Sequence, residues 1–270
     1  MTTSARDRFD ISVPAGAAII IAVLLLSASR LFAQRQVEGG NSGPPGESVT
    51  ARAAQKAYEE RRFADALTIF RAAAGEGNAR SMGFLGFMYR QGQGVPRDDQ
   101  MAHDWFEKAA AAGDMFAMNA LGLMYKSAEG VPRDFAIARG WFERGAAAGN
   151  ANSMNQLALM YEAAEGVPRD YAMARQWFEK SAMAGEAAAM NNLGVMFETG
   201  LGIPRDYDAA RQWFEKAANL GSAVAMRNLG RMYESGFGVA PDLLVARQWY
   251  ERGAAGGDAP ARQWLRDHPQ

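Results

Sequence analysis

The side chains best suited to acid–base or nucleophilic chemistry are scarce in this sequence. It holds two histidines, His103 and His268, and no cysteine, which excludes disulfides, thiolate catalysis and zinc–thiolate sites. His103 stands where equivalent positions later in the sequence carry arginine, so we predict a solvated helix position for it. No Gly-x-Ser-x-Gly, Ser-x-x-Lys or phosphate-loop sequence occurs. The sequence therefore predicts no catalytic, cofactor-binding or metal-binding residue.

The overall charge argues against nucleic acid as a partner. The 29 basic and 30 acidic residues give a formal net charge of -1, so no general excess of positive charge is present to neutralise phosphates. With 270 residues, of which 49% are hydrophobic, the chain can bury a substantial core. The arrangement of the apolar residues is therefore the better guide to function.

Residues 1–33 have the composition of a membrane anchor or an export signal. Arg6 and Arg8 precede an uncharged run from Ile11 to Ser29, which as a helix would reach roughly 28 Å, close to the roughly 30 Å hydrocarbon thickness of a bilayer. We predict a single-pass transmembrane segment that is retained. The alternative is a signal peptide cleaved behind small residues, after Ser29 or Ala33.

A linker and a repeat array are predicted to follow. Residues 34–50 are rich in Gly and Pro and lack apolar periodicity, as expected of a flexible linker. Beyond it, tryptophan recurs five times at intervals of 36 residues, each time followed by an aromatic and an acidic residue: Trp105, Trp141, Trp177, Trp213 and Trp249. The corresponding five units are residues 78–113, 114–149, 150–185, 186–221 and 222–257. A fixed period of this length indicates one supersecondary element per unit, stacked on its neighbours.

Each unit has the pattern of a helical hairpin. Its first half carries apolar residues at helical spacing, for example Met118, Leu121 and Met124. A Gly and Pro breaker follows, and an aspartate such as Asp134 is placed to cap the second helix. The recurring tryptophans lie on the second helix of each unit, and we assign them to the repeat core. Small residues in the first helix predict a close approach of the two helices: Gly86, Gly122, Gly194 and Gly230, with Ala158 in the third unit.

The repeat resembles a known family. The pattern Ala-x-x-Met-x-Asn-Leu-Gly-x-Met-Tyr-Glu-x-Gly-x-Gly-Val-Pro-x-Asp, ending in Trp-Phe-Glu-Lys-Ala-Ala-x-x-Gly, is similar to the Sel-one-like repeat (SLR), a relative of the tetratricopeptide repeat. The departures are few, such as Phe197 for Tyr and Ala240–Pro241 for Pro-Arg. Residues 51–77 resemble a degenerate tetratricopeptide hairpin and would cap the array, as would a short helix in 258–270. The resemblance implies an all-α solenoid, a right-handed superhelix of about six antiparallel hairpins.

Two series of amides are candidates for peptide binding. The first series occupies one position of the first helix in three successive units and consists of Asn119, Asn155 and Asn191. Gly83 and Arg227 occupy this position in the first and last units. The second series, Asn192 and Asn228, occupies the next position along the helix. If the first helix lines the inner surface, as in tetratricopeptide repeats, these amides could hold an extended peptide through its backbone. Their removal should then leave stability nearly unchanged. The alternative is that they satisfy polar groups between repeats.

The resemblance also implies a function. Members of this family are protein scaffolds, often at the bacterial cell envelope, so we expect a non-catalytic adaptor in the inner membrane, with its repeats in the periplasm and a protein or extended peptide as partner. Other possibilities are a secreted or periplasmic product of signal cleavage, a cytoplasm-facing membrane adaptor, and a cell-envelope hydrolase or β-lactam-binding enzyme on the same fold. β-Lactam-binding relatives are rich in paired cysteines, and this chain has no cysteine.

Overall fold

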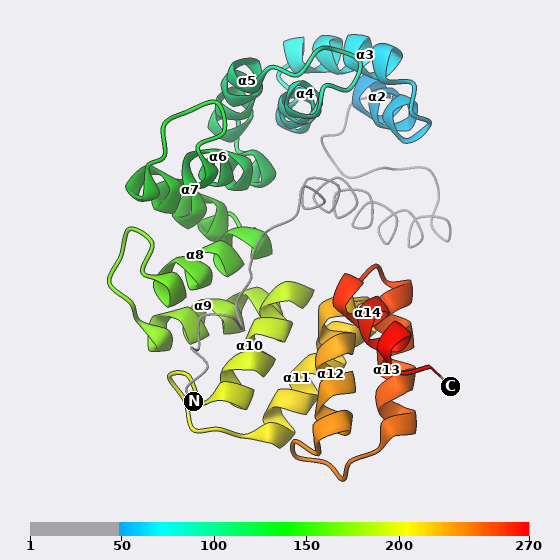
Figure 1. Ribbon diagram of the computed structural model, residues 1–270. Helices are drawn as coiled ribbons and strands as arrows, with labels where there is room; N and C mark the ends of the chain where they lie inside the picture. Colours follow the sequence, from blue (N-terminus) through cyan, green and yellow to red (C-terminus); the bar gives the residue numbers. More distant parts are fainter. Residues whose placement is uncertain (1–48, 270) are drawn as a thin grey trace.

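The structure, a computed structural model, describes residues 49–269. In this part of the chain, thirteen helices and no strand are present. Their bounds, labelled as in Figure 1, are α2 Val49–Glu59, α3 Phe63–Gly75, α4 Ala79–Gln91, α5 Asp99–Ala111, α6 Met115–Ser127, α7 Phe135–Ala147, α8 Ala151–Ala163, α9 Tyr171–Met183, α10 Ala187–Thr199, α11 Tyr207–Asn219, α12 Ala223–Ser235, α13 Leu243–Ala255 and α14 Ala259–Asp267.

The predicted membrane segment, residues 1–33, and residues 34–48 of the predicted linker lie outside the described residues. Helix α2 includes Val49 and Thr50, which the sequence analysis placed in the linker, so this helix begins before the predicted boundary at residue 51. Among the helices of residues 49–269, none combines the length and the apolar character needed to cross a membrane.

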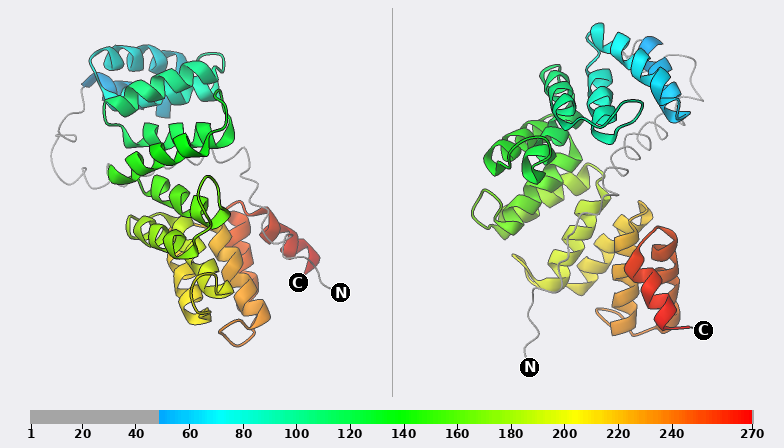
Figure 2. Two further views of the ribbon diagram at one scale, coloured as in Figure 1. Left: turned by 90° about the vertical axis from the view of Figure 1, so that its left-hand side faces the viewer. Right: turned by 45° about the horizontal axis from the view of Figure 1, so that its top comes forward.

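Consecutive helices pair as hairpins, from α2 with α3 to α12 with α13, and α14 packs on α13. The second helix of each hairpin also contacts the first helix of the next, as α5 contacts α6. The hairpins follow one another along an open arc (Figure 1), and Figure 2 shows the same succession of layers from two other directions. This architecture is the helical solenoid that the repeat pattern predicts.

The aspartates predicted to cap the second helices do so. Each side chain accepts a hydrogen bond from a backbone N–H two or three residues further on, and such caps stabilise a helix by about 1 kcal/mol. The five residues are Asp98, Asp134, Asp170, Asp206 and Asp242. The start of every second helix in the repeats is therefore determined by its own sequence.

The loop inside each repeat rests on the preceding repeat. Gly166 has a φ of +69°, and a Cβ at this residue would lie 2.5 Å from the Cβ of Phe135, the first residue of α7. Gly130 makes the equivalent approach to Asp99, at the start of α5. Only glycine combines this left-handed conformation with so close a contact. The loop contact couples neighbouring repeats, in addition to the packing of their helices.

The close helix contact predicted from the small residues is present. A Cβ added to Gly86 would lie 2.7 Å from the ring of Phe106, and one added to Gly194 would lie 2.5 Å from the ring of Phe214. Gly122 and Gly230 meet the rings of Phe142 and Tyr250 in the same way. The aromatic residue that fills the core is thus the one directly after each tryptophan, and it is almost completely buried in every repeat.

The tryptophans, which we assigned to the repeat core, are partly buried and pack against its edge. Each ring packs against the edge of a core cluster while a cation three residues further along the helix lies over it. The charged atoms lie 4.1 to 4.5 Å from the ring centroids, in the pairs Trp105–Lys108, Trp141–Arg144, Trp177–Lys180, Trp213–Lys216 and Trp249–Arg252. Such cation–π pairs cover one face of each indole.

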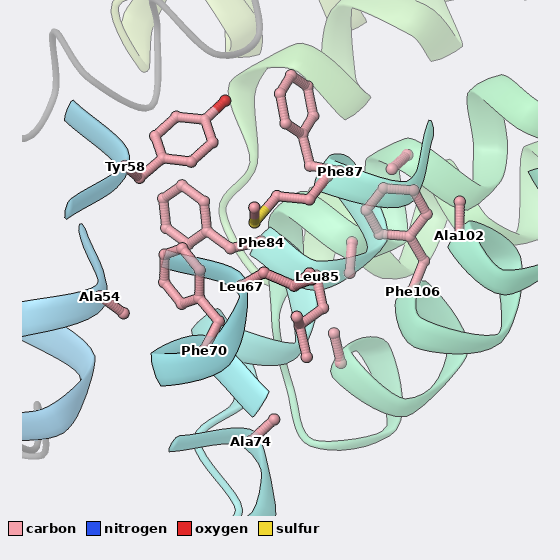
Figure 3. Packing of buried hydrophobic residues seen from close by; sticks show 14 of the residues in the cluster. Ala54, Tyr58, Leu67, Phe70, Ala74, Phe84, Leu85, Phe87, Ala102 and Phe106 are labelled. Atoms are coloured by element: carbon pink, nitrogen blue, oxygen red, sulfur yellow. The ribbon is translucent and has the colours of Figure 1, made fainter. Parts of the chain in front are cut away.

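The N-terminal end of the core has an aromatic cluster in place of this glycine contact. Tyr58, Phe70 and Phe84 lie against one another in Figure 3, and the rings of Phe70 and Phe84 are stacked with centroids 4.7 Å apart. Burial raises the pKa of Tyr58 to about 12, and its hydroxyl donates a 2.7 Å hydrogen bond to Gln93. The hairpin of α2 and α3 thereby closes the apolar surface of the first repeat.

Candidate functional site

The first helices of the repeats line the inner side of the arc. Besides the contacts within and between hairpins, α4 touches α6 and α6 touches α8. In a curved stack the more closely spaced series of helices lies inside, and Figure 1 shows α4 and α6 on that side. An extended partner lying along the inner face would meet these helices one after another.

The structure brings the two predicted amide series together. Asn191 Oδ1 accepts a 2.9 Å hydrogen bond from Asn228 Nδ2, and Asn155 Oδ1 accepts a 3.2 Å bond from Asn192 Nδ2. Asn119 Oδ1 accepts a 3.3 Å bond from the Ser153 hydroxyl. Each bond therefore joins one repeat to the next, and we call this set the amide ladder: Asn119, Asn155, Asn191, Asn192 and Asn228.

Burial and pairing favour the structural alternative for the amide ladder. Asn119, Asn155, Asn191 and Asn228 are each no more than 9% exposed, so a lost partner would leave a buried polar group at a cost of about 1–3 kcal/mol. We therefore no longer expect that their removal leaves stability unchanged. Contact with a peptide stays a prediction, because the Nδ2 groups of Asn119, Asn155 and Asn191 donate no bond within residues 49–269 and are not fully enclosed.

The amide ladder is interrupted at both ends. Arg227 occupies the ladder position in α12, and its Nε lies 3.7 Å from the carboxylate of Asp258. Gly83 occupies it in α4, where it lines a pocket between α4 and α6. The cavity volume is about 30 Å³, and the pocket is partly open to solvent. Its wall includes Phe84, Phe87 and Phe116, and the charged residues around it are Arg80, Arg90 and Asp114.

Ion pairs join the inner residues of several neighbouring repeats. Arg90 pairs with Glu129 of the next repeat, and Lys126 pairs at 2.9 Å with Glu165 of the repeat after that. Arg231 pairs at 2.5 Å with the buried Glu198. Glu162 follows the same register as Arg90 and Lys126, but burial raises its pKa and Arg169 offsets this only in part. These charged pairs were not predicted from the sequence, although the interruption of the ladder at Gly83 was visible in the repeat pattern.

The prediction that His103 is solvated was wrong. The residue is 7% exposed, and its Nε2 lies 3.2 Å from the hydroxyl of Tyr125 on the next repeat. His268 stacks on Trp264 with ring centroids 4.3 Å apart. Within residues 49–269 no three His, Asp or Glu side chains are grouped so that they could hold a metal ion. Both histidines thus make packing contacts.

Comparison with known proteins identifies the repeat. The Sel1 repeat family model matches five times, over residues 79–114, 116–150, 151–186, 187–222 and 223–258. The structure is similar to that of a Sel1 repeat protein from Oxalobacter formigenes, with a TM-score of 0.75 and 32% identity over 79% of this chain and 87% of that one. No curated protein matches the chain.

A second solved structure shares the repeats but is part of a longer protein. It is a protective antigen of uropathogenic Escherichia coli strains that displays an SLR fold, with a TM-score of 0.63 and 33% identity. The similarity covers 77% of this chain and 45% of the antigen. The match therefore concerns the solenoid, and about half of that antigen has no counterpart here.

Proposed function

The chain belongs to the Sel1 repeat family, and from this premise we propose that it is a non-catalytic scaffold at the bacterial cell envelope that holds a partner protein or peptide on its inner face. Sel1 repeat proteins are generally protein-interaction scaffolds. The five repeats give this chain one continuous inner surface of similar helices. The proposal concerns how that surface is used and where in the cell it acts.

The observation that carries the proposal is the orientation of the amide ladder. The Oδ1 atoms of Asn119, Asn155 and Asn191 are each held by a donor of the next repeat. This fixes the amides in place and leaves their Nδ2 groups available to a carbonyl group of a partner. Packed helices lie roughly 8–10 Å apart, and an extended peptide advances about 3.3 Å per residue. Successive amides would therefore meet about every third peptide carbonyl.

We further propose that residues 11–29 hold the protein in the inner membrane and that the repeats lie in the periplasm. The support comes from the sequence: an uncharged run long enough to span, preceded by Arg6 and Arg8, and a Gly and Pro rich stretch before the first helix. Cleavage of this segment would give a periplasmic or secreted protein, and the opposite orientation would give a cytoplasm-facing adaptor. Each of these products would still carry the same inner face.

Site-specific photo-crosslinking tests the use of the inner face. A benzophenone amino acid would replace Leu123 or Leu159, which occupy the register of the pocket residue Phe87. The matched control sites are Gln176 and Gln212, exposed residues of the second helices. We expect both inner sites to capture the same protein in cells, identified by mass spectrometry, while the outer sites do not. Capture at the outer sites alone would place the binding surface on the second helices, and no capture at any site would argue against a scaffold.

A further inference from the structure

We propose that Glu162, on the inner face of α8, binds a lysine or arginine side chain of the partner segment. The proposal rests on the scaffold function proposed above, because it assumes that a partner segment lies along the inner face. It adds a requirement to that face: one residue of the segment carries a positive charge at the end of a long aliphatic stem. This contact would lie near the middle of the arc, where α8 is found (Figure 1).

Glu162 belongs to a row of charged side chains near the ends of the first helices, one from each repeat: Arg90, Lys126, Glu162, Glu198 and Glu234. Lys126 precedes Glu162 in this row and pairs at 2.9 Å with Glu165, in the loop of the next repeat. Arg90 forms the equivalent pair one repeat earlier. In the fourth repeat, however, Leu201 stands where Glu165 stands in the third. The loop that follows Glu162 therefore offers it no charge at this position.

The two carboxylates that come after Glu162 in the row are already engaged. Glu198 is buried and pairs at 2.5 Å with an arginine of the next repeat. Glu234 accepts hydrogen bonds from the Tyr250 hydroxyl at 2.7 Å and from Trp264 Nε1 at 2.9 Å. Within residues 49–269, Glu162 makes neither a hydrogen bond nor a salt bridge. It is thus the member of the row whose carboxylate is left for another molecule.

The charge of Glu162 is incompletely compensated in the folded chain. Its side chain is half-buried, and the loss of solvent raises its pKa. Arg169, an exposed residue of the loop in the same repeat, offsets this effect only in part and forms no salt bridge with it. Groups whose ionisation is disfavoured by the fold are concentrated at functional sites. A cation of the partner would supply the interaction that the carboxylate lacks.

The neighbours of Glu162 favour a long cationic side chain over a small one. Asn155, Leu159 and Glu162 are spaced four and three residues apart, so they share one face of α8. Leu159 is partly buried at the edge of a core cluster, and Asn155 is held in place by Asn192. Lysine and arginine cover apolar surface with their methylene groups while the charged end stays in a polar environment. Such a side chain could contact Leu159 and Glu162 together, with a backbone carbonyl of the segment near Asn155.

Peptide selection tests the proposal on the full-length chain. The probe is a display library of random ten-residue peptides, and binders are kept if they crosslink to a benzophenone at Leu123 or Leu159. We expect these binders to share a lysine or arginine at one position. Replacement of that residue by norleucine or citrulline, which keep its length but not its charge, should weaken binding about ten-fold in fluorescence anisotropy. Binders that crosslink at the inner face without a shared basic residue would overturn the proposal and leave the scaffold function intact.

The variant Glu162→Gln locates the contact, because it keeps the shape of the side chain and removes its charge. We expect it to weaken the selected basic peptide about ten-fold at pH 7 while the melting temperature stays the same or rises, so unfolding could not explain the loss. Glu143→Gln, on an exposed side chain of α7, is the matched control and should bind as the unaltered chain does. Unchanged affinity in Glu162→Gln would refute the contact.

Charge reversal distinguishes a direct contact from a general effect of charge. We expect Glu162→Lys to reject the basic peptide and to prefer the same peptide with glutamate at the basic position, since opposite charges placed together are favoured and like charges are excluded. Glu143→Lys should keep the original preference. An identical preference in the two lysine variants would show that Glu162 does not touch the charged residue of the segment.

Discussion

Asn191 and Asn228 show how single residues link neighbouring repeats in this fold. They lie in α10 and α12, and the bond between them joins two buried side chains across 37 positions of sequence. A buried amide retains this arrangement only while its partner is present, because an unpaired polar group in the interior is costly. Asn191 can therefore contribute to stability through Oδ1 and to recognition through Nδ2, whereas Asn228 contributes to stability through Nδ2.

A double-mutant cycle on this pair separates the two roles at the residue scale. We expect Asn191→Ala and Asn228→Ala each to lower the free energy of unfolding by about 1–3 kcal/mol, because each leaves one buried amide unpaired. The double variant should cost less than the sum, with a coupling energy of at least about 0.5 kcal/mol in urea unfolding. Asn219→Ala, at an exposed helix end, is the control. Zero coupling would mean that the bond does not contribute to stability and would favour a role in peptide contact alone.

Replacing Glu162 is expected to raise the free energy of unfolding, whereas replacing Asn191 or Asn228 is expected to lower it. Burial raises the pKa of its carboxyl group above the ordinary value, so the folded state binds this proton more tightly than the unfolded state does. The group therefore favours folding at low pH, and this contribution is lost as the pH rises through the raised pKa. We expect Glu162→Gln to raise the urea midpoint at pH 7, with the gain vanishing below roughly pH 4. Glu143→Gln, on an exposed side chain, should show no such gain; an equal gain in both would contradict the assignment.

At the scale of the element, the hairpin depends on a contact between a glycine and an aromatic ring. Leucine at Gly194 would have to displace the ring of Phe214, which a Cβ alone would approach to 2.5 Å. We expect Gly194→Leu to cost about 3 kcal/mol or more in urea or thermal unfolding, since overpacked cores shift backbone and rotamers. Gly140→Leu, on an open face of α7, should be neutral or stabilising through its helix propensity. Similar effects of the two changes would show that the close contact is not needed.

The helices and hairpins were the most predictable part of this structure, because each repeat shows the same local sequence pattern. Helical spacing, the breaker and the capping aspartates determine the hairpins, and the small residues at Gly86 and Gly194 indicate where the two helices meet. The pattern could not tell which of two adjacent aromatic residues fills the core. Trp213 and Phe214 are about 100° apart on one helix, and only the crossing of the helices directs Phe214 onto Gly194. The amide pairs and the environment of His103 depend on contacts between different repeats, which no single repeat reveals.

At the scale of the whole molecule, the solenoid couples its parts only through neighbours. Each hairpin contacts the next through helices and through the glycine loop, as at Gly166 and Phe135. A stack of this kind gains stability from its interfaces and presents a long surface relative to its length. If the proposed membrane attachment holds, the compartment in which this surface meets its partner depends on the orientation of the chain in the membrane.

The whole-molecule prediction concerns this attachment. We expect the mature protein to keep residues 11–29 and to sediment with membranes, because the uncharged run can span a bilayer. Since the chain has no cysteine, Gln176→Cys on an exposed helix position provides a single thiol for a membrane-impermeant maleimide. Labelling in intact spheroplasts would place the repeats in the periplasm, and labelling only after lysis would place them in the cytoplasm. A soluble product whose N-terminus is Arg30 or Gln34 would instead identify a cleaved signal peptide, and the inner face would then act away from the membrane.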